Sequence, residues 1–101
     1  MDLRISFMGV IASVTGMKHL ALSVEGTPTL RMVIDQLEHR FGTEFGKRVY
    51  RNSSPPRQLQ LCTRIFVNRE LVGESALDEA LTPVGDSPEI LIYLLPAVCG
   101  G

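Results

Sequence analysis

The sequence predicts an α+β fold, a small mixed sheet of four to five strands with one main helix across one face. Two observations point to this class. Apolar and polar residues alternate in segments near both ends of the chain, which is the period of half-buried strands. One apolar stripe at helical spacing covers residues 30–41, without a regular alternation of strands and helices. With 101 residues, 45% of them hydrophobic, the chain can build one core.

The first two strands are expected to form an N-terminal hairpin. Leu3, Ile5 and Phe7 alternate with polar neighbours, and this strand is expected to continue to about Ile11. After a glycine-containing turn, residues 20–24 alternate again and predict the second strand.

The helix is predicted from its stripe and from both of its ends. Its apolar residues recur every three or four positions and comprise Leu30, Val33, Ile34, Leu37 and Phe41. Either Thr27 or Thr29 can cap the N-terminus, because a threonine hydroxyl accepts a hydrogen bond from an otherwise unpaired backbone N–H. Gly42 is expected to end the helix.

The rest of the chain completes the predicted sheet. We expect helical turns at 43–50, a proline-containing loop at 51–57, a strand at 59–67, a short strand at 71–72, a helical turn at 75–81, a loop at 83–88 and a final strand at 89–95. The main helix would supply the crossover between the second and third strands that parallel pairing requires. The predicted domain therefore spans residues 1–95, and residues 96–101 are predicted to be a flexible tail.

The tail carries the most specific functional signal, Gly100-Gly101. Glycine has no Cβ, so these residues can pass through a channel too narrow for others, and the α-carboxylate stays sterically open. Such an end suits chemistry performed on the carboxylate by another protein. The alternative is a frayed terminus, which often carries small residues. The apolar strand that leads directly into the tail favours the functional interpretation.

The composition argues against several classes of function. A net charge of −1 gives no electrostatic footprint for nucleic acid. No apolar run approaches the roughly 20 residues that span a bilayer, so no membrane partner is expected. The N-terminus lacks a basic segment followed by an apolar one, which is the pattern of a secretory signal. We therefore expect a cytoplasmic, reduced protein.

The sequence shows no self-contained catalytic or metal site. His19 and His39 lack the cysteine or carboxylate neighbours of a metal site or a catalytic pair. Cys62 and Cys99 lie too far apart for metal-ligand spacing. Cys99 is expected either to take part in thiol exchange or to fill a position where alanine, threonine or serine would serve equally. A carrier or substrate protein is expected, and not an enzyme.

An apolar patch is predicted on the sheet face that points away from the helix. Side chains alternate between the two faces of a strand, so Met8 points outward when Leu3 and Phe7 point inward. The same parity places Leu95 outward, and Leu71 lies in the short strand nearby. Outward apolar clusters often mark partner surfaces, whereas scattered surface hydrophobes are the alternative.

These features together resemble the ubiquitin-like sulfur carriers of the MoaD/ThiS family. The resemblance extends over nearly the whole chain and is carried by the helix at 29–37, the segment Ile65-Phe66-Val67-Asn68-Arg69-Glu70-Leu71-Val72, the Gly85-Asp86 turn and the tail Leu95-Pro96-Ala97-Val98-Cys99-Gly100-Gly101. The resemblance implies a β-grasp fold.

The resemblance also implies a reaction and its partners. An E1-like enzyme of the MoeB/ThiF type would adenylate the Gly101 carboxylate with ATP, and a sulfur donor would convert it to a thiocarboxylate for an acceptor enzyme. In this scheme Gly101 carries the sulfur, and Val98, Cys99 and Gly100 give access to it. Met8, Leu71 and Leu95 would contact the E1-like enzyme, and the chain itself binds no cofactor.

Two departures bear on the pathway. The chain is longer than typical members of the family, with a long loop at 52–58 and Ser87-Pro88 inserted after Gly85-Asp86. The long loop and the tail at 95–101 look more like CysO-type carriers, which serve cysteine synthesis, or like carriers of siderophore and other secondary-metabolite pathways. Molybdopterin or thiamine synthesis is possible but less favoured. Some such carriers are trimmed after Gly-Gly by a JAMM-type metalloprotease, which is then a further partner.

Two other hypotheses stay open. A ubiquitin-like modifier would be linked through Gly101 to lysines on its targets. A binding module would use its sheet edge or its apolar patch, and its tail would be incidental.

Overall fold

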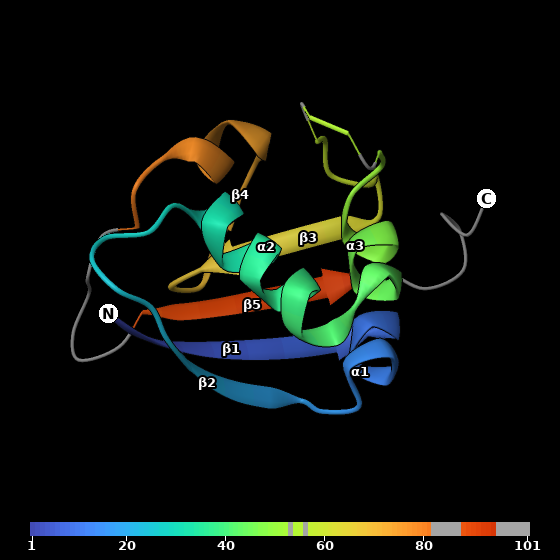
Figure 1. Ribbon diagram of the computed structural model, residues 1–101, viewed down its shortest axis with the longest axis horizontal. Helices are drawn as coiled ribbons and strands as arrows, with labels where there is room; N and C mark the ends of the chain where they lie inside the picture. Colours follow the sequence, from blue (N-terminus) through green and yellow to red (C-terminus); the bar gives the residue numbers. More distant parts are fainter. Residues whose placement is uncertain (53, 56, 82–87, 95–101) are drawn as a thin grey trace.

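The computed structural model describes residues 1–52, 54–55, 57–81 and 88–94, and Figure 1 shows their arrangement. The elements are β1 (Asp2–Gly9), α1 (Val10–Thr15), β2 (His19–Ser23), α2 (Leu30–Phe41), α3 (Thr43–Val49), β3 (Thr63–Val67), β4 (Glu70–Val72), the 3₁₀ helix η1 (Glu74–Asp78) and β5 (Glu89–Leu94). This order confirms the α+β class. The expected loop at 83–88 lies largely outside the described residues, and the tail at 96–101 lies wholly outside them.

The five strands form one mixed sheet in the order β2-β1-β5-β3-β4. β1 and β5 pair in parallel at its centre, and the other neighbours pair antiparallel. The expected crossover between the second and third strands is therefore wrong in one respect, because β2 and β3 are not adjacent. The parallel pair instead joins the first strand to the last.

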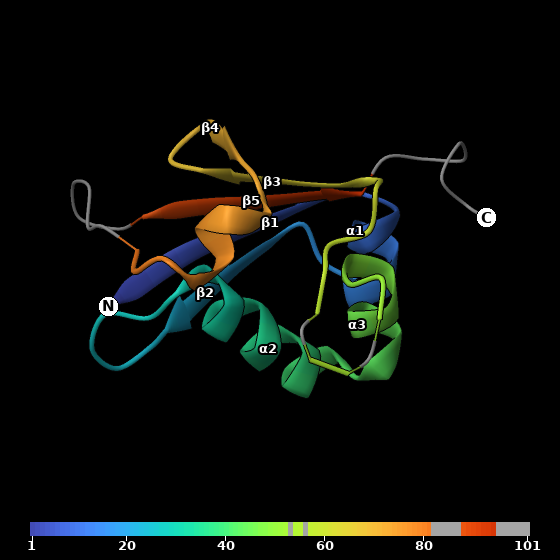
Figure 2. The ribbon, with the colours of Figure 1, turned by 90° about the horizontal axis from the view of Figure 1, so that it is seen from above.

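The core lies between the sheet and the helices. Figures 1 and 2 show α2 crossing one side of the sheet, with α3 on the same side. The inward positions of the central strands and the α2 stripe are almost fully buried, and they include Leu3, Ile5, Phe7, Leu30, Val33, Ile34, Leu37, Ile65, Ile90 and Ile92. Because strand side chains alternate, the neighbouring positions point to the opposite face of the sheet.

The ends of α2 match the prediction. Thr29 is the N-cap, and its hydroxyl oxygen accepts a hydrogen bond from the backbone N–H of Met32 at 3.2 Å. Gly42 ends the helix with φ 97°, a conformation that favours glycine. The expected helical turns that follow are present as α3.

The first strand is shorter than predicted. β1 ends at Gly9, which has φ 74°, and α1 follows where the strand was expected to reach Ile11. Ile11 is still buried, but it enters the core from a helix. A spacing of four residues from Phe7 returns to the same face in either element, so the apolar pattern alone did not distinguish them. The predicted pairing of the first two strands is confirmed.

The third strand begins later than predicted, at Thr63. The chain turns just before it, where the backbone N–H of Thr63 donates to the carbonyl of Gln60 at 3.0 Å. The Val49 carbonyl accepts from the backbone N–H of Gln60 at 2.9 Å and from the Thr63 hydroxyl at 3.1 Å. This turn is therefore held against the end of α3. It leaves Leu61 71% exposed, although the apolar alternation predicted an inward side chain.

Arg57 ties the long loop to α2. Its guanidinium lies over the ring of Tyr50, with 4.0 Å from the guanidinium carbon to the ring centroid, and pairs with the Glu38 carboxylate through two hydrogen bonds. The Tyr50 hydroxyl donates to Asp35 at 3.0 Å. Burial raises the pKa of the Tyr50 phenol well above its usual value, so it stays protonated as this donor. The arginine thereby anchors the chain after residue 56.

Candidate partner-binding face

The outer face of the sheet presents a row of side chains that runs across all five strands. Ser6 on β1 lies opposite His19 on β2 and Leu91 on β5. Leu91 lies opposite Phe66 on β3, which in turn lies opposite Leu71 on β4. The register of four strand pairs thus brings together residues that are up to 85 positions apart in the sequence.

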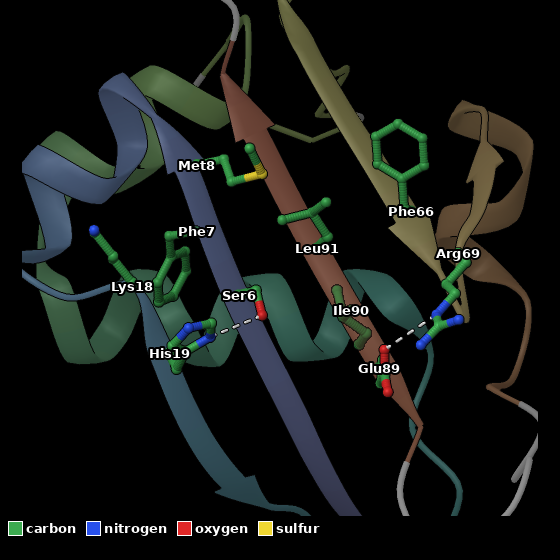
Figure 3. Close-up of a pocket in the computed structure, with 10 residues that line it drawn as sticks. All are labelled: Ser6, Phe7, Met8, Lys18, His19, Phe66, Arg69, Glu89, Ile90 and Leu91. Carbon is green, nitrogen blue, oxygen red and sulfur yellow. Dashed lines mark hydrogen bonds and ion pairs between the residues drawn. The ribbon is translucent and has the colours of Figure 1, made fainter.

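The middle of this face is apolar. Met8 is 47% exposed and Leu71 is 59% exposed, while Phe66 and Leu91 are half-buried. A pocket of about 490 Å³ lies over β1, β5 and β3, and Figure 3 shows Met8, Leu91 and Phe66 side by side along it. We call the set Met8, Phe66, Leu71 and Leu91 the outer patch. An exposed apolar surface of this kind is suited to covering by a protein partner.

A polar rim borders the outer patch at the end where β5 begins. Glu89 forms ion pairs with Arg4 and with Arg69, the latter at 4.0 Å. Ser6 Oγ lies 3.2 Å from His19 Nδ1, and Figure 3 shows this contact and the pair of Glu89 with Arg69 as dashed lines. Apolar centres with polar rims are the usual composition of protein–protein interfaces.

The turn between β3 and β4 is fixed to β5 by Asn68. The side-chain oxygen of Asn68 accepts a hydrogen bond from the backbone N–H of Glu89 at 3.0 Å. The backbone N–H of Asn68 donates to the Glu89 carbonyl at 2.8 Å. Asn68 and Arg69 both have positive φ, which asparagine tolerates better than most residues. The turn therefore also sets the position of Arg69 on the rim.

The described part of β5 runs toward the tail at the opposite end of the outer patch. Met8 lies opposite Tyr93, and Tyr93 lies opposite Arg64, one residue before the end of the strand. The outer patch therefore extends along β5 to the last pairs that the structure describes.

The structure describes two of the residues predicted to form the site, Met8 and Leu71. Both are exposed on the outer face, and Phe66 and Leu91 connect them. Side-chain parity predicted this position for Met8, whereas Leu71 was placed there only by its short strand. Sequence analysis missed Phe66, although it alternates with the buried Ile65 and so had to point outward. The other predicted site residues, Leu95, Val98, Cys99, Gly100 and Gly101, lie outside the described residues.

Cys62 lies beside the end of the sheet that β5 reaches. It directly precedes Thr63, which pairs with Leu94, and it is 4% exposed. We expected a reduced thiol here, but Cys62 is disulfide-bonded. The expectation rested on the cysteine count and spacing, which say nothing about where a cysteine lies in the fold.

Within the described ranges, no group of three or more His, Cys, Asp or Glu side chains is arranged to hold a metal ion. The helices among those residues are also too short or too polar to cross a bilayer.

No family model matches this sequence, and no curated protein sequence matches it. Solved structures do match. SAMP1 from Haloferax volcanii is 22% identical with a TM-score of 0.73, and the match covers 100% of both chains. A putative molybdopterin converting factor subunit 1 from Pyrococcus furiosus is 15% identical with a TM-score of 0.68, and the match covers 92% of this chain and 95% of that one.

CysO from Mycobacterium tuberculosis is more similar in sequence. It is 30% identical with a TM-score of 0.65, and the match covers 95% of this chain and 99% of that chain. These proteins share the mixed sheet with a helix across it, and the predicted β-grasp fold is confirmed.

Proposed function

Because this chain belongs to the family of ubiquitin-like sulfur carriers and modifiers, which includes MoaD, SAMP1 and CysO, we propose that it carries sulfur on Gly101. The observation that carries the proposal is the 30% identity to CysO over nearly the full length of both chains. The sequence also supports the proposal, because its tail after Pro96 contains Gly100 and Gly101, the two glycines that the proposed reaction requires.

The proposed reaction has two steps, both performed by other proteins. The Gly101 carboxylate attacks the α-phosphorus of ATP on an E1-like enzyme of the MoeB/ThiF type, and pyrophosphate leaves. A sulfur donor then attacks the carbonyl carbon of the acyl adenylate and displaces AMP. The product is a thiocarboxylate on Gly101. The chain serves as cosubstrate, and ATP is bound and consumed by its partner. Residues 98–100 supply the thin segment that enters the partner's active site.

The outer patch supports the proposal as the docking surface. It is apolar at its centre, charged at its rim and continuous with the strand that leads to the tail. An enzyme that covers Met8 and Leu71 would hold the end of β5 in a fixed position, so that the tail enters the active site at a high effective concentration. Leu95, the third predicted contact, follows directly after β5.

The receiving pathway is proposed from sequence similarity. Identity to CysO is 30%, against 15% to the molybdopterin converting factor subunit, so cysteine synthesis or a sulfur-containing secondary metabolite is favoured over molybdopterin or thiamine. An acceptor enzyme of that pathway would consume the thiocarboxylate. A JAMM-type metalloprotease would be needed if the gene encodes residues after Gly101.

Intact-protein mass spectrometry tests the proposal. The chain is incubated with ATP, a sulfide source and the E1-like enzyme of its organism. We expect a mass gain equal to the replacement of one oxygen by sulfur, localised to Gly101. The chain without Gly101 is the control and should show no gain while keeping its fold. No gain in the full chain with an enzyme active on another carrier would contradict the proposal.

A second function has support from one comparison. The solved structures from Haloferax volcanii and Methanosarcina acetivorans are named small archaeal modifier proteins. A modifier would use the same adenylate but transfer Gly101 to a lysine amine. Conjugates of high mass in cells that disappear when Gly101 is removed would favour this function. Activity that survives extra residues after Gly101 would instead favour a plain binding module.

A further inference from the structure

A groove opens at the edge of the sheet because β4 is shorter than β3. The three residues of β4 pair with residues 65–67 of β3, and none of them lies opposite Thr63 or Arg64. The chain leaves the sheet at Gly73, where an added Cβ atom would meet no atom within 4 Å. The space beside the start of β3 is a groove of about 350 Å³. We call it the arginine groove and use six of its lining residues: Arg51, Leu61, Arg64, Leu71, Gly73 and Glu74.

Two exposed leucines give the arginine groove its apolar surface. Leu61 is 71% exposed and lies in the turn that the Val49 carbonyl holds, and Leu71 is 59% exposed on β4. Leu71 also belongs to the outer patch, so the groove and the outer patch form one continuous surface. Because the turn fixes Leu61 outward, its side chain stays in contact with water until a partner covers it.

Two arginines give the groove its charge. Arg64 is half-buried, and its guanidinium donates to the carbonyls of Leu61 at 2.6 Å and of Thr63 at 3.2 Å. Arg51 is exposed, and its backbone N–H donates to the Gln58 carbonyl at 2.6 Å. These hydrogen bonds fix where the two residues lie, but they leave both positive charges in place because a carbonyl carries no net charge.

No carboxylate within the described ranges forms an ion pair with either arginine of the groove. Among the described lining residues only Glu74 is acidic, and one of its carboxylate oxygens accepts from the backbone N–H of Leu59 at 3.0 Å. The opposite end of the outer patch differs, because Arg4 and Arg69 are both paired with Glu89 there. The arginine groove is therefore the end of this surface where positive charge remains available to a partner.

The composition of the groove favours a protein segment as its occupant. Pockets for small ligands have volumes of about 300–1,000 Å³ and enclose most of the ligand, whereas this groove is small and its leucines are largely exposed. Single-stranded nucleic acid is bound through bases stacked on aromatic side chains, and none of the described lining residues is aromatic. Arginines bind carboxylates through paired, charge-assisted hydrogen bonds. An acidic segment that also carries an apolar side chain would match both the arginines and the leucines.

We propose that the arginine groove binds an acidic segment of the E1-like enzyme, an inference that rests on the proposed function. Carboxylates of that segment pair with Arg51 and Arg64, and an apolar side chain packs between Leu61 and Leu71. The contact lies one strand away from the end of β5, because Arg64 pairs with Tyr93. It extends the interface beyond the outer patch and selects the enzyme, since a basic surface at this position would be repelled.

The test measures binding and adenylation of the full chain by the E1-like enzyme of its organism. Arg51→Glu reverses the charge of an exposed residue of the groove, and Lys47→Glu makes the same change at an exposed residue of α3 that does not line it. We expect Arg51→Glu to raise both the Kd from calorimetry without ATP and the KM for the carrier by about tenfold or more. Its kcat should stay within about twofold of wild type, because the contact holds the carrier equally before and during the reaction. Lys47→Glu should change the Kd and KM by less than about twofold.

Two further measurements separate the apolar contact from the charged one. Leu61→Ser removes the exposed apolar side chain and should raise the Kd by about threefold or more. Raising NaCl from about 0.05 M to about 0.5 M should weaken binding of the wild type and of Leu61→Ser, and should weaken binding of Arg51→Glu less. Both substituted residues are exposed, so the urea midpoints of the variants should match that of the wild type.

The groove and the proposed function fail in different ways. A Kd that Arg51→Glu and Lys47→Glu raise equally would indicate a general attraction between charged surfaces and would overturn the groove. Unchanged binding of Leu61→Ser, or self-association of the wild type that Arg51→Glu abolishes, would overturn it as well. A wild type that binds through the groove but gains no sulfur would overturn the proposed function alone. A wild type that neither binds nor reacts would overturn both.

Discussion

Gly46 on α3 lies so close to Glu38 on α2 that a Cβ atom on the glycine would fall 1.7 Å from the carboxylate Oε2. The two helices therefore meet at a glycine, and the carboxylate occupies the space where a side chain would be. That carboxylate has little freedom to move aside, because Arg57 binds both of its oxygens.

We predict that Gly46→Ala destabilises the protein by about 1–2 kcal/mol, although alanine is favoured over glycine by about 1 kcal/mol inside a helix. The methyl group would displace Glu38 from Arg57. In a Glu38→Ala background the obstruction is absent, so the same substitution should stabilise. Urea unfolding of the wild type, both single variants and the double variant gives the coupling free energy between the substitutions at Gly46 and Glu38. Additive effects would show that Glu38 is not the obstacle.

The stability of the protein should depend on pH through Glu38. Its hydrogen bonds with Arg57 lower the pKa of the carboxyl below its usual value of 4.5. A carboxyl whose pKa is lower in the folded state contributes stability above the unfolded pKa and loses it as the pH falls through the folded pKa. The urea midpoint of the wild type should therefore drop more between about pH 6 and about pH 3, on either side of the usual carboxyl pKa, than that of Glu38→Gln. Parallel curves for the two proteins would contradict this.

The outer patch should control docking without affecting the fold. Met8 and Met32 are methionines of similar exposure, 47% and 53%, on the sheet and on α2 respectively. We predict that Met8→Glu raises the KM for the carrier in the adenylation reaction by about tenfold or more, because it places a charge at the centre of the apolar contact. Met32→Glu is the matched control and should leave the KM within about twofold of wild type. Equal effects of the two substitutions on the KM would show that the outer patch is not part of the interface.

The N-terminus of α2 offers a test with two threonines. Thr29→Ala removes the hydroxyl oxygen that accepts from Met32 and should cost about 1 kcal/mol of folding free energy. Thr27 is exposed and lies two residues earlier, so Thr27→Ala should change the free energy of unfolding by less than about 0.5 kcal/mol. Thermal or urea unfolding of both variants gives the comparison. A larger loss in Thr27→Ala would mean that the cap is wrongly assigned.

The sequence predicted best where the signal was local. The stripe of α2, its threonine cap and its glycine end all lie within 14 consecutive residues, and all were confirmed. Side-chain parity likewise placed Met8 on the outer face, because alternation within one strand decides it.

The first strand was extended too far because the spacing from Phe7 to Ile11 fits both a strand and a helix, and the other errors and omissions arose where a distant contact decides the structure. The alternation from Leu59 to Val67 continued through Gln60 and Leu61, but the Val49 carbonyl binds the turn there and delays the strand. The pairing of Arg57 with Glu38 joins a loop to a helix 19 residues away, and no spacing in the sequence encodes it. Phe66 was missed as part of the outer patch because its neighbours on that face come from other strands.

The central position of β5 has a consequence for biosynthesis. Translation produces this strand last among the elements described, yet it separates β1 from β3 and pairs with both. A nascent chain that stops before residue 89 has two disconnected strand pairs and no closed core. Folding must wait until β5 has left the ribosome, because its contacts span almost the whole chain. Incomplete chains would remain unfolded and would be degraded by proteases. The proteins that remain to bind a partner would therefore all contain β5, the strand that leads to the tail.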